Sequence, residues 1–433
     1  GMEVNRLSAL TPPMGWNSWD CYGASVTEEE VLGNAEYMAN HLKKYGWEYI
    51  VVDIQWYEPT ANSSAYNPFA PLCMDEYGRL LPATNRFPSA KNGAGFKPLS
   101  DAIHDLGLKF GIHIMRGIPR QAVYENSPVL GSTKTAREIA HTNSICPWNT
   151  DMYGVDPTKE GAQSYYNSLF ELYAQWGVDF VKVDDIAASR LYDTHLEEIK
   201  MIQRAIQACG RPMVLSLSPG PAPIKYAHHF KTNANMWRIT DDFWDDWSLL
   251  YQMFERCEVW EKHIGTGHWP DCGMLPLGHI GIRSVDGPGG DRWTRFTKDE
   301  QLTMMNLWAI CHSPLMFGGE LRDNDEWTLS LLTNEGILSI NQKSVLNRFV
   351  YREEDKVAWA ANGRNGEAYV ALFNLHDQQK TLQFRLDMVG IMETVQLFNV
   401  WDRSFLQSLA PSESFQIELK PHQSMMLKLS PDR

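Results

Sequence analysis

Short apolar runs and segments of helical spacing alternate along the first three quarters of the chain. The apolar runs, which predict strands, stand at residues 14–19, 49–54, 108–114, 178–184, 212–218, 234–240, 274–278 and 314–319. The segments with apolar residues every three or four positions, which predict helices, stand at residues 26–45, 96–106, 165–176, 196–209, 248–260 and 299–311. Thr27, with Glu30 three residues later, predicts a capping box at the first of these helices. The repeated strand-helix unit predicts a (β/α)8 TIM barrel of the α/β class.

Two long segments lack this rhythm. Residues 57–95 and 116–160 are interpreted as enlarged loops of the barrel. After residue 340 the pattern changes to short alternating runs, which are separated by turn residues such as Asn362-Gly363. Alternation with a period of two is typical of strands with one buried face. We therefore predict two domains, a barrel over residues 1–340 and a C-terminal antiparallel β-sandwich domain over residues 341–433.

Polar side chains stand at or near the ends of the predicted strands. The fourth strand is apolar up to Lys182 and ends in Asp184, with Asp185 directly after it. The other strands contribute Trp16, Trp19, Asp53, Trp56, His113, Ser216, Ser218, Arg238, Asp241 and Asp242. In barrels of this kind, functional residues come from the carboxyl ends of several strands, so we expect these side chains at one mouth of the barrel.

Carboxylates from the fourth and sixth strands are expected to face each other across this mouth. Retaining glycoside hydrolysis uses such a pair, a nucleophilic carboxylate and a carboxyl group that exchanges protons, roughly 5–5.5 Å apart. Lys182 would keep Asp184 ionised, as a nucleophile must be. Arg238 can bind sugar hydroxyls or a carboxylate with its planar fork. Asp184 and Asp242 are therefore the candidate catalytic residues.

Structural roles stay open for several of these residues. Lys182 and Asp184 can form an ion pair at a barrel rim, and Asp242 can cap the helix that holds Trp247. His113 fits a hydrogen-bonded core histidine better than a proton shuttle, and the strand-end tryptophans fit barrel packing. No histidines and carboxylates stand at the spacing of metal ligands, so neither a metal nor a cofactor is expected.

The charge balance and the aromatic content narrow the range of expected binding partners. The chain has 39 basic and 53 acidic residues, a net charge of -14, which argues against nucleic acid or an anionic membrane as a partner. Many of the 16 Trp and 17 Tyr residues stand beside polar residues, where aromatic rings suit the faces of sugars, although most are expected in the core. The oligomeric state is not set by the sequence, and a homo-oligomer stays open.

Cysteine usage and the first residues favour a reducing compartment. The seven cysteines are odd in number and form no CxxC pair, so neither a zinc site nor a disulfide framework is expected. The opening residues Gly-Met-Glu-Val-Asn-Arg lack an apolar signal region, and we expect a cytoplasmic protein unless such a region was removed beforehand. No stretch approaches the roughly 20 apolar residues of a membrane span.

Five motifs stand in an order that carries a family resemblance. They are Thr11-Pro-Pro-Met-Gly-Trp-Asn-Ser-Trp19, Val178-Asp-Phe-Val-Lys-Val-Asp184, Trp237-Arg238 with Asp242 four residues after the arginine, Trp269-Pro-Asp-Cys-Gly-Met-Leu275 and Ser313-Pro-Leu-Met-Phe-Gly-Gly319. Together they resemble glycoside hydrolase family 27, the melibiase-like family of α-galactosidases and α-N-acetylgalactosaminidases. The resemblance runs in register through the predicted barrel and continues more loosely through the C-terminal domain.

The resemblance implies a fold, a reaction and a set of roles. The fold is a (β/α)8 barrel with a C-terminal antiparallel β domain. The reaction is retaining hydrolysis of a terminal α-D-galactosyl-type residue of an oligosaccharide or glycoconjugate, without a cofactor. By position, the nucleophile falls on Asp184 and the acid/base on Asp242. The substrate-binding candidates, taken from the family positions and the strand ends together, are Trp19, Asp53, Trp56, His113, Lys182, Ser218, Arg238 and Met274.

Several positions depart from the family's pattern. Ile54 stands where a second Asp usually helps to hold the C6 hydroxyl, and this change allows β-L-arabinopyranosides, which present the galactose ring without C6. Ser218 and its small neighbours leave room for an acetamido group at C2. His113 stands in place of a family Tyr, and Asp185-Ile186 replace the Cys after the nucleophile, so the usual active-site disulfide is absent.

Three interpretations of function therefore stay open. The first is an α-galactosidase or α-N-acetylgalactosaminidase, and the second is a β-L-arabinopyranosidase of the same family. The third, from a different class, is a catalytically inactive carbohydrate-binding barrel. Both Asp184 and Asp242 are retained, and a lectin needs neither a nucleophile nor an acid, so the third interpretation is disfavoured.

Overall fold

The computed structural model describes residues 4–63, 65–189, 191–284 and 289–432. The chain divides into two compact units, which are described separately. The first unit comprises Gly1–Trp244, Gly265–Thr294 and Leu315–Asn324, and the second comprises Asp245–Ile264, Arg295–Pro314 and Asp325–Arg433. The domain boundary predicted at residue 340 stays a prediction.

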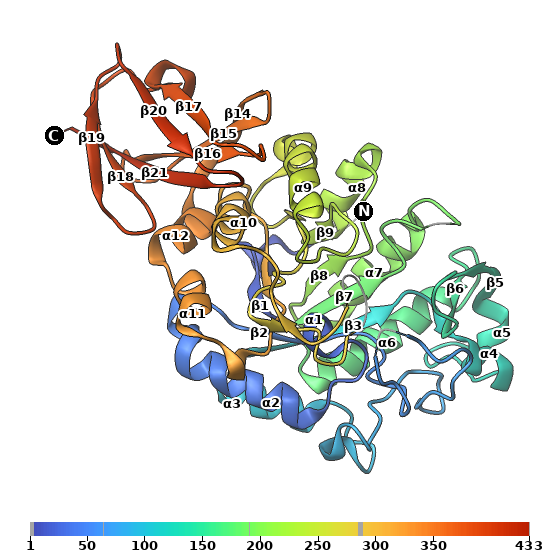
Figure 1. Cartoon of the computed structure of the whole chain (residues 1–433). Helices are drawn as coiled ribbons and strands as arrows, with labels where there is room; N and C mark the ends of the chain where they lie inside the picture. The colour runs from blue at the N-terminus through green and yellow to red at the C-terminus, as the bar shows by residue number, and fades with distance from the viewer. Residues whose placement is uncertain (1–3, 64, 190, 285–288, 433) are drawn as a thin grey trace. The chain divides into compact units, whose positions relative to one another are not determined.

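Eight parallel strands form the centre of the first unit (Figure 1). In chain order they are β1 (Met14–Asn17), β2 (Tyr49–Val52), β3 (Lys109–Met115), β7 (Phe180–Asp184), β8 (Val214–Leu217), β9 (Met236–Arg238), β10 (Trp269–Asp271) and β13 (Leu315–Phe317). From β1 to β10 each strand pairs with the next one in this order, and β13 pairs with β1, so β10 and β13 are the two ends of the strand order. Beyond β10, Leu275 forms a parallel bridge to Phe317 of β13. This bridge brings the two ends of the strand order together and confirms the predicted TIM-like barrel.

The helices of the first unit confirm the predicted rhythm. They include α2 (Glu28–Tyr37), α3 (Lys97–Asp105), α6 (Ala162–Trp176) and α7 (Leu196–Cys209), which lie outside the strands in Figure 1. The single helix predicted over residues 26–45 is instead α2 followed by the π turn η2 (Met38–Leu42) and the 3₁₀ turn η3 (Lys43–Tyr45). Met38 and Leu42 are both buried in the π turn, so the wider turn keeps both side chains on the core face.

Two sequence-based assignments in the first unit are wrong. The segment 116–160 is no plain loop, because it contains the three-stranded sheet β4-β6-β5 (Ile118–Pro119, Met152–Val155 and Ala140–Ile145) together with α4 (Arg120–Glu125) and α5 (Ala136–Ile139). The strand β5 reads Ala-His-Thr-Asn-Ser-Ile, with three residues exposed and three partly buried, so it carries no apolar alternation to detect. The seventh barrel strand lies at β10 rather than at 274–278, since Gly273 turns the chain with a left-handed φ of 98°.

The second unit carries the predicted antiparallel β domain. One sheet has the order β14-β15-β16-β21-β18-β19 (Val345–Glu353, Lys356–Asn362, Ala368–Asn374, Ser424–Pro431, Val395–Asn399 and Phe405–Leu409). The other sheet pairs β17 (Lys380–Arg385) with β20 (Ser414–Leu419). Side chains from both sheets, among them Leu372, Phe384, Leu397 and Phe415, share one buried cluster, as expected for a β-sandwich.

Four helices also belong to the second unit. They are α9 (Trp247–Trp260), α10 (Lys298–Ile310), α11 (Glu326–Leu332) and α12 (Glu335–Lys343). Strands β14 and β19 were not predicted, because most of their side chains are partly or fully exposed and the apolar alternation is weak. Within the part of the chain that the structure describes, no helix is both long and apolar enough to cross a membrane.

The capping box predicted at the start of α2 is confirmed. The carboxylate of Glu30 accepts hydrogen bonds from the backbone N–H and the hydroxyl of Thr27, each at 3.0 Å. We predict that Thr27→Ala lowers the free energy of unfolding of the first unit by about 0.5–2 kcal/mol, because amide groups at the helix start lose their partner. Urea titration followed by circular dichroism measures the change. Thr27→Ser, which keeps the hydroxyl, should stay close to the unsubstituted protein, and an equal loss in both variants would contradict the role of the cap.

Candidate functional site

A pocket of about 620 Å³ opens at the carboxyl ends of the barrel strands, within the first unit. This volume is in the range of sites for small molecules. The pocket is lined by Trp19, Asp53, Ile54, Tyr66, Trp148, Lys182, Asp184, Ala188, Ser189, Ser218, Pro219, Gly220, Pro221, Arg238, Asp241 and Asp242. Five of the eight predicted barrel strands thus contribute a residue at or just beyond their end, as the barrel rule predicts.

An ion pair between Asp53 and Lys182 lies at one side of the pocket. Lys182 on β7 donates to Asp53 Oδ2 at 2.9 Å, and the amide of Asn17 on β1 donates to the same oxygen at 2.9 Å. The other oxygen of Asp53 accepts the N–H of Ile54 at 2.8 Å. Burial opposes the charge of Asp53, but the charge of Lys182 and these hydrogen bonds hold its pKa well below the usual range. One ionised carboxylate at the end of β2 therefore links β1 and, across β3, β7.

Asp184 is the carboxylate at the end of β7. Its Oδ2 lies 2.8 Å from Nε2 of His113 on the neighbouring strand β3, and its Oδ1 accepts the N–H of Asp185 at 2.8 Å. Burial again opposes the charge, but the hydrogen bond to His113 and the nearby charge of Lys182 lower the pKa of Asp184 below its ordinary value. With 14% of its side chain accessible, Asp184 is an ionised group that faces the pocket.

Asp242 follows β9, and its pKa is shifted in the opposite direction from that of Asp184. Its Oδ1 lies 3.8 Å from Nη1 of Arg238, whose Nε donates to Asp271 at 3.4 Å. In the pocket mouth 52% of the Asp242 side chain is accessible, but the protein atoms around the carboxyl group still disfavour its charge. This burial, together with the Asp184 and Asp241 carboxylates, raises the pKa of Asp242 to about 6, against the opposing effect of Arg238 and Lys182.

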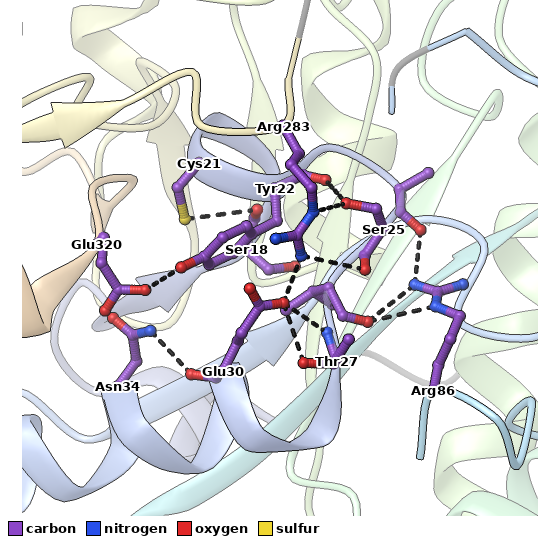
Figure 2. A network of polar contacts seen from close by, with 12 residues as sticks. Ser18, Cys21, Tyr22, Ser25, Thr27, Glu30, Asn34, Arg86, Arg283 and Glu320 are labelled. Carbon is purple, nitrogen blue, oxygen red and sulfur yellow. Dashed lines mark hydrogen bonds and ion pairs between the residues drawn. The ribbon is translucent and has the colours of Figure 1, made fainter. Parts of the chain in front are cut away.

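A polar network holds the segment that carries Trp19 (Figure 2). Trp19 begins the short helix α1 (Trp19–Tyr22), and its N–H donates to the side chain of Asn17 at 2.8 Å. Arg283 lies against this segment in Figure 2. It donates to the hydroxyl of Ser25 at 2.9 Å, pairs with Glu30, and lies over the ring of Tyr22. The segment that follows Trp19 is therefore held by a side chain far away in the sequence, while Trp19 itself is held by the nearby Asn17.

The remaining predicted site residues take different places. Ser218 lines the pocket, and its hydroxyl is buried without a hydrogen-bond partner in the structure. His113 is buried behind Asp184 rather than in the pocket lining. Met274 lies beneath the site beside Lys182 and Arg238. Trp56 is fully buried, donates to the carbonyl of His113 at 2.7 Å and packs edge-on against other rings, so the structure does not bring it to the pocket.

Several lining residues were not found from the sequence. Tyr66 and Trp148 come from the two segments interpreted as loops, and their rings lie 5.9 Å apart, with Tyr66 also stacked against Trp19 at 6.5 Å. Ala188 and Ser189 follow the fourth strand, in the stretch beyond Asp185. No periodic pattern marks these positions, because they lie outside regular elements or next to exposed strands. Only their aromatic character in a turn-rich segment could have pointed to Tyr66 and Trp148.

The arrangement supports chemistry by two carboxyl groups of different protonation. Around neutral or mildly acidic pH, Asp184 carries a negative charge while Asp242 holds or exchanges a proton. Among residues 4–63, 65–189, 191–284 and 289–432, no cluster of three or more His, Cys, Asp or Glu side chains is arranged to hold a metal ion. A nucleophile and a proton donor within one pocket of this size suit a displacement at a small polar ring.

Two family models match most of the chain. The model described as "Alpha galactosidase A" matches residues 151–343, and the model described as "Alpha galactosidase C-terminal beta sandwich domain" matches residues 353–429. Among curated proteins, the chain is 25% identical to alpha-galactosidase 2 of Arabidopsis thaliana, over 99% of this chain and 92% of that protein. It is 27% identical to an alpha-galactosidase of Cyamopsis tetragonoloba, over 97% and 86%.

Solved structures give higher similarity. A structure from Bacillus halodurans, provisionally described as an alpha-N-acetylgalactosaminidase, is 96% identical over all of both chains, with a TM-score of 0.91. A family 27 β-L-arabinopyranosidase from Geobacillus stearothermophilus is 67% identical over 99% of this chain and 98% of that one, with a TM-score of 0.97. A variant of that enzyme in complex with arabinose is 66% identical over 99% of both chains, with a TM-score of 0.98.

Proposed function

This chain belongs to glycoside hydrolase family 27, and we propose that it removes terminal α-D-galactosyl-type residues by a double displacement that retains the anomeric configuration. The observation that supports this reaction best is the opposite protonation of two carboxyl groups in one pocket. Asp184 is held ionised by His113 and Lys182, whereas the pKa of Asp242 is raised to about 6. These are the states that a nucleophile and a general acid require.

In the first step, Asp184 attacks C1 of the sugar. A bond forms between C1 and a carboxylate oxygen of Asp184, while the bond from C1 to the aglycone oxygen breaks and that oxygen takes the proton of Asp242. In the second step, Asp242 removes a proton from water, the water oxygen bonds to C1, and Asp184 leaves as a carboxylate. Lys182 and Asp53 offer polar contacts to the ring hydroxyls at the side of the pocket.

We predict that Asp184→Asn reduces turnover to background while the circular dichroism spectrum and the melting temperature stay near those of the unsubstituted protein. The amide is no longer a charged nucleophile, but it can still contact His113 and the N–H of Asp185. A 2-deoxy-2-fluoroglycosyl fluoride should label the unsubstituted enzyme at Asp184, as read by peptide mass mapping. Label on Asp185, or normal turnover by the Asn variant, would overturn the assignment.

The pH profile of kcat/KM should be bell-shaped. On the alkaline side, activity is expected to fall as pH rises through about 6, because Asp242 loses the proton that the leaving group needs. On the acidic side, activity should persist to below pH ~4, because the pKa of Asp184 is lowered and its carboxylate stays charged. Asp242→Ala, tested with a 2,4-dinitrophenyl glycoside that needs no acid, should lack the alkaline limb. A limb that persists in this variant would assign the titration to another group.

A second candidate substrate is a terminal β-L-arabinopyranoside. Ile54 lines the pocket directly after Asp53, and its side chain is apolar and buried. A C6 hydroxyl placed against Ile54 would lose its water without gaining a partner, whereas a pentopyranose has no such group. The 67% identical β-L-arabinopyranosidase supports this candidate. The small residues from Ser218 to Pro221 leave the C2 side open, so α-N-acetylgalactosaminides belong in the same test.

If the second candidate is the substrate, kcat/KM is expected to be higher for an aryl β-L-arabinopyranoside than for the matching α-D-galactoside or α-N-acetylgalactosaminide. Ile54→Asp should shift the ratio of arabinopyranoside to galactoside activity toward the galactoside by about 10–100-fold, because a hydrogen-bond partner for C6 is restored. Ile54→Leu, which keeps the pocket apolar, serves as the matched control. A preference for the galactoside in the unsubstituted enzyme would favour the first candidate, an α-D-galactosyl-type substrate. If no aglycone is released from any substrate, a sugar-binding barrel would be favoured.

A further inference from the structure

Asp185, the residue after the proposed nucleophile, has an unusual backbone conformation. Its φ of 56° lies in the left-handed region, which residues other than glycine rarely adopt without support from their surroundings. In this conformation its N–H points back and donates to Oδ1 of Asp184 at 2.8 Å. Oδ2 of Asp184 accepts a hydrogen bond from Nε2 of His113, so both oxygens of Asp184 are held. The orientation of the carboxylate therefore depends on how Asp185 is kept in place.

Arg116 holds the Asp184–Asp185 segment in place through three contacts, two of them to Asp185. Its Nε donates to the carbonyl of Asp185 at 2.6 Å, and its Nη2 lies 3.2 Å from Asp185 Oδ2. Its backbone N–H donates to the carbonyl of Asp184 at 3.0 Å. Arg116 directly follows β3, whose last residue Met115 pairs with Asp184 in the barrel sheet. The guanidinium group of the buried Arg116 thus binds both the carbonyl and the carboxylate of Asp185, whose N–H donates to the nucleophile Asp184.

Arg116 is itself fixed from the opposite side. Its Nη1 lies 3.0 Å from Oε2 of Glu198 on α7. The other oxygen of Glu198 accepts the hydroxyl of Tyr166 at 2.8 Å and the N–H of Val155 at 3.0 Å. All of these side chains are buried, so the guanidinium group has few alternative positions. Only arginine has the planar fork that these bonds require.

We propose that Arg116 is a positioning residue for the nucleophile Asp184, acting through Asp185. The inference rests on the proposed function, because it assumes that Asp184 attacks the sugar. When the contacts between Arg116 and Asp185 are lost, Asp185 relaxes from its left-handed conformation and Asp184 Oδ1 loses its N–H donor. The carboxylate can then rotate away from the line of attack, and misplacement of a reacting group by about 1 Å can reduce the rate about 100-fold.

The test compares Arg116→Lys and Asp185→Ala with the unsubstituted enzyme. Lysine keeps a positive charge but cannot hold the carbonyl and the carboxylate together. We expect kcat and the rate of labelling by the 2-fluoroglycosyl fluoride to fall about 10–100-fold in Arg116→Lys, while KM and the inhibition constant of the free sugar change less than about threefold. The acidic limb of kcat/KM should move to higher pH, because a carboxylate that loses a hydrogen-bond donor has a higher pKa.

Arg211 provides a matched control, because it binds residues just before β7, the strand that Asp185 follows. Its Nε donates to the carbonyl of Val178 at 2.9 Å, and its Nη2 lies 2.7 Å from Asp179 Oδ1, so it makes the same kind of grip just before β7. Arg211→Lys should lower the melting temperature but leave the labelling rate and the acidic limb unchanged. If Arg116→Lys behaves in the same way as Arg211→Lys, the inference is overturned.

Asp185→Ala keeps the inference testable if Arg116→Lys does not fold. It removes the carboxylate that Arg116 holds, and its labelling rate should fall in the same direction. Where all variants fold, the double variant with Arg116→Lys and Asp185→Ala should be labelled only a little more slowly than the slower single variant. Both changes break the same contacts. Unchanged labelling in Asp185→Ala, or fully multiplied losses in the double variant, would overturn the inference. Label on a residue other than Asp184 in the unsubstituted enzyme would instead overturn the proposed function.

Discussion

A charged carboxylate at the buried end of a barrel strand is the constraint on which the rest of the site depends. Burial alone would drive Asp184 toward its neutral form, which is useless as a nucleophile. The barrel prevents this by bringing His113 from β3 and Lys182 from β7 to the same spot. These two strands are neighbours in a parallel sheet, with His113 and Lys182 in register. The strand order therefore sets the protonation state of the nucleophile as well as its position.

The same pocket keeps Asp242 in a different state because its surroundings differ. The contact of the Asp242 carboxyl group to Arg238 is long, at 3.8 Å, whereas Lys182 lies 2.9 Å from Asp53. Arg238 lies closer to Asp271, so part of its charge is already balanced. Burial of the carboxyl group, together with the Asp184 and Asp241 carboxylates, therefore outweighs the attraction of Arg238 and Lys182 and raises the pKa of Asp242. Two aspartates of identical chemistry thus acquire different roles from packing and distance alone.

The barrel and the carboxylate pair could be predicted from the sequence because both depend on local patterns. Apolar runs marked most strands, and polar residues at their ends marked Lys182, Asp184 and Arg238. The sequence did not reveal contacts that depend on tertiary structure. Arg116 and Asp185 are 69 residues apart, and Trp56, which stands at a strand end like the others, turns inward and is fully buried. Strand β5 was missed because its side chains are exposed and polar, which is also why Trp148, between β5 and β6, was not foreseen.

The departures from the family pattern are concentrated on three neighbouring strands and are linked physically. Ile54 follows β2, His113 lies on β3 and Asp185 follows β7. The resemblance implies a disulfide beside the nucleophile, and here Asp185 and Arg116 form a buried ion pair in that region instead. An ion pair needs no oxidising compartment, but it must be enclosed by groups that hold its partners in place. Glu198 supplies this enclosure, since it binds Nη1 of Arg116, and Tyr166 in turn donates a hydrogen bond to Glu198. A change at the residue after the nucleophile is therefore compatible with an ordered site only together with this group of buried residues, which lies on β3, α6 and α7.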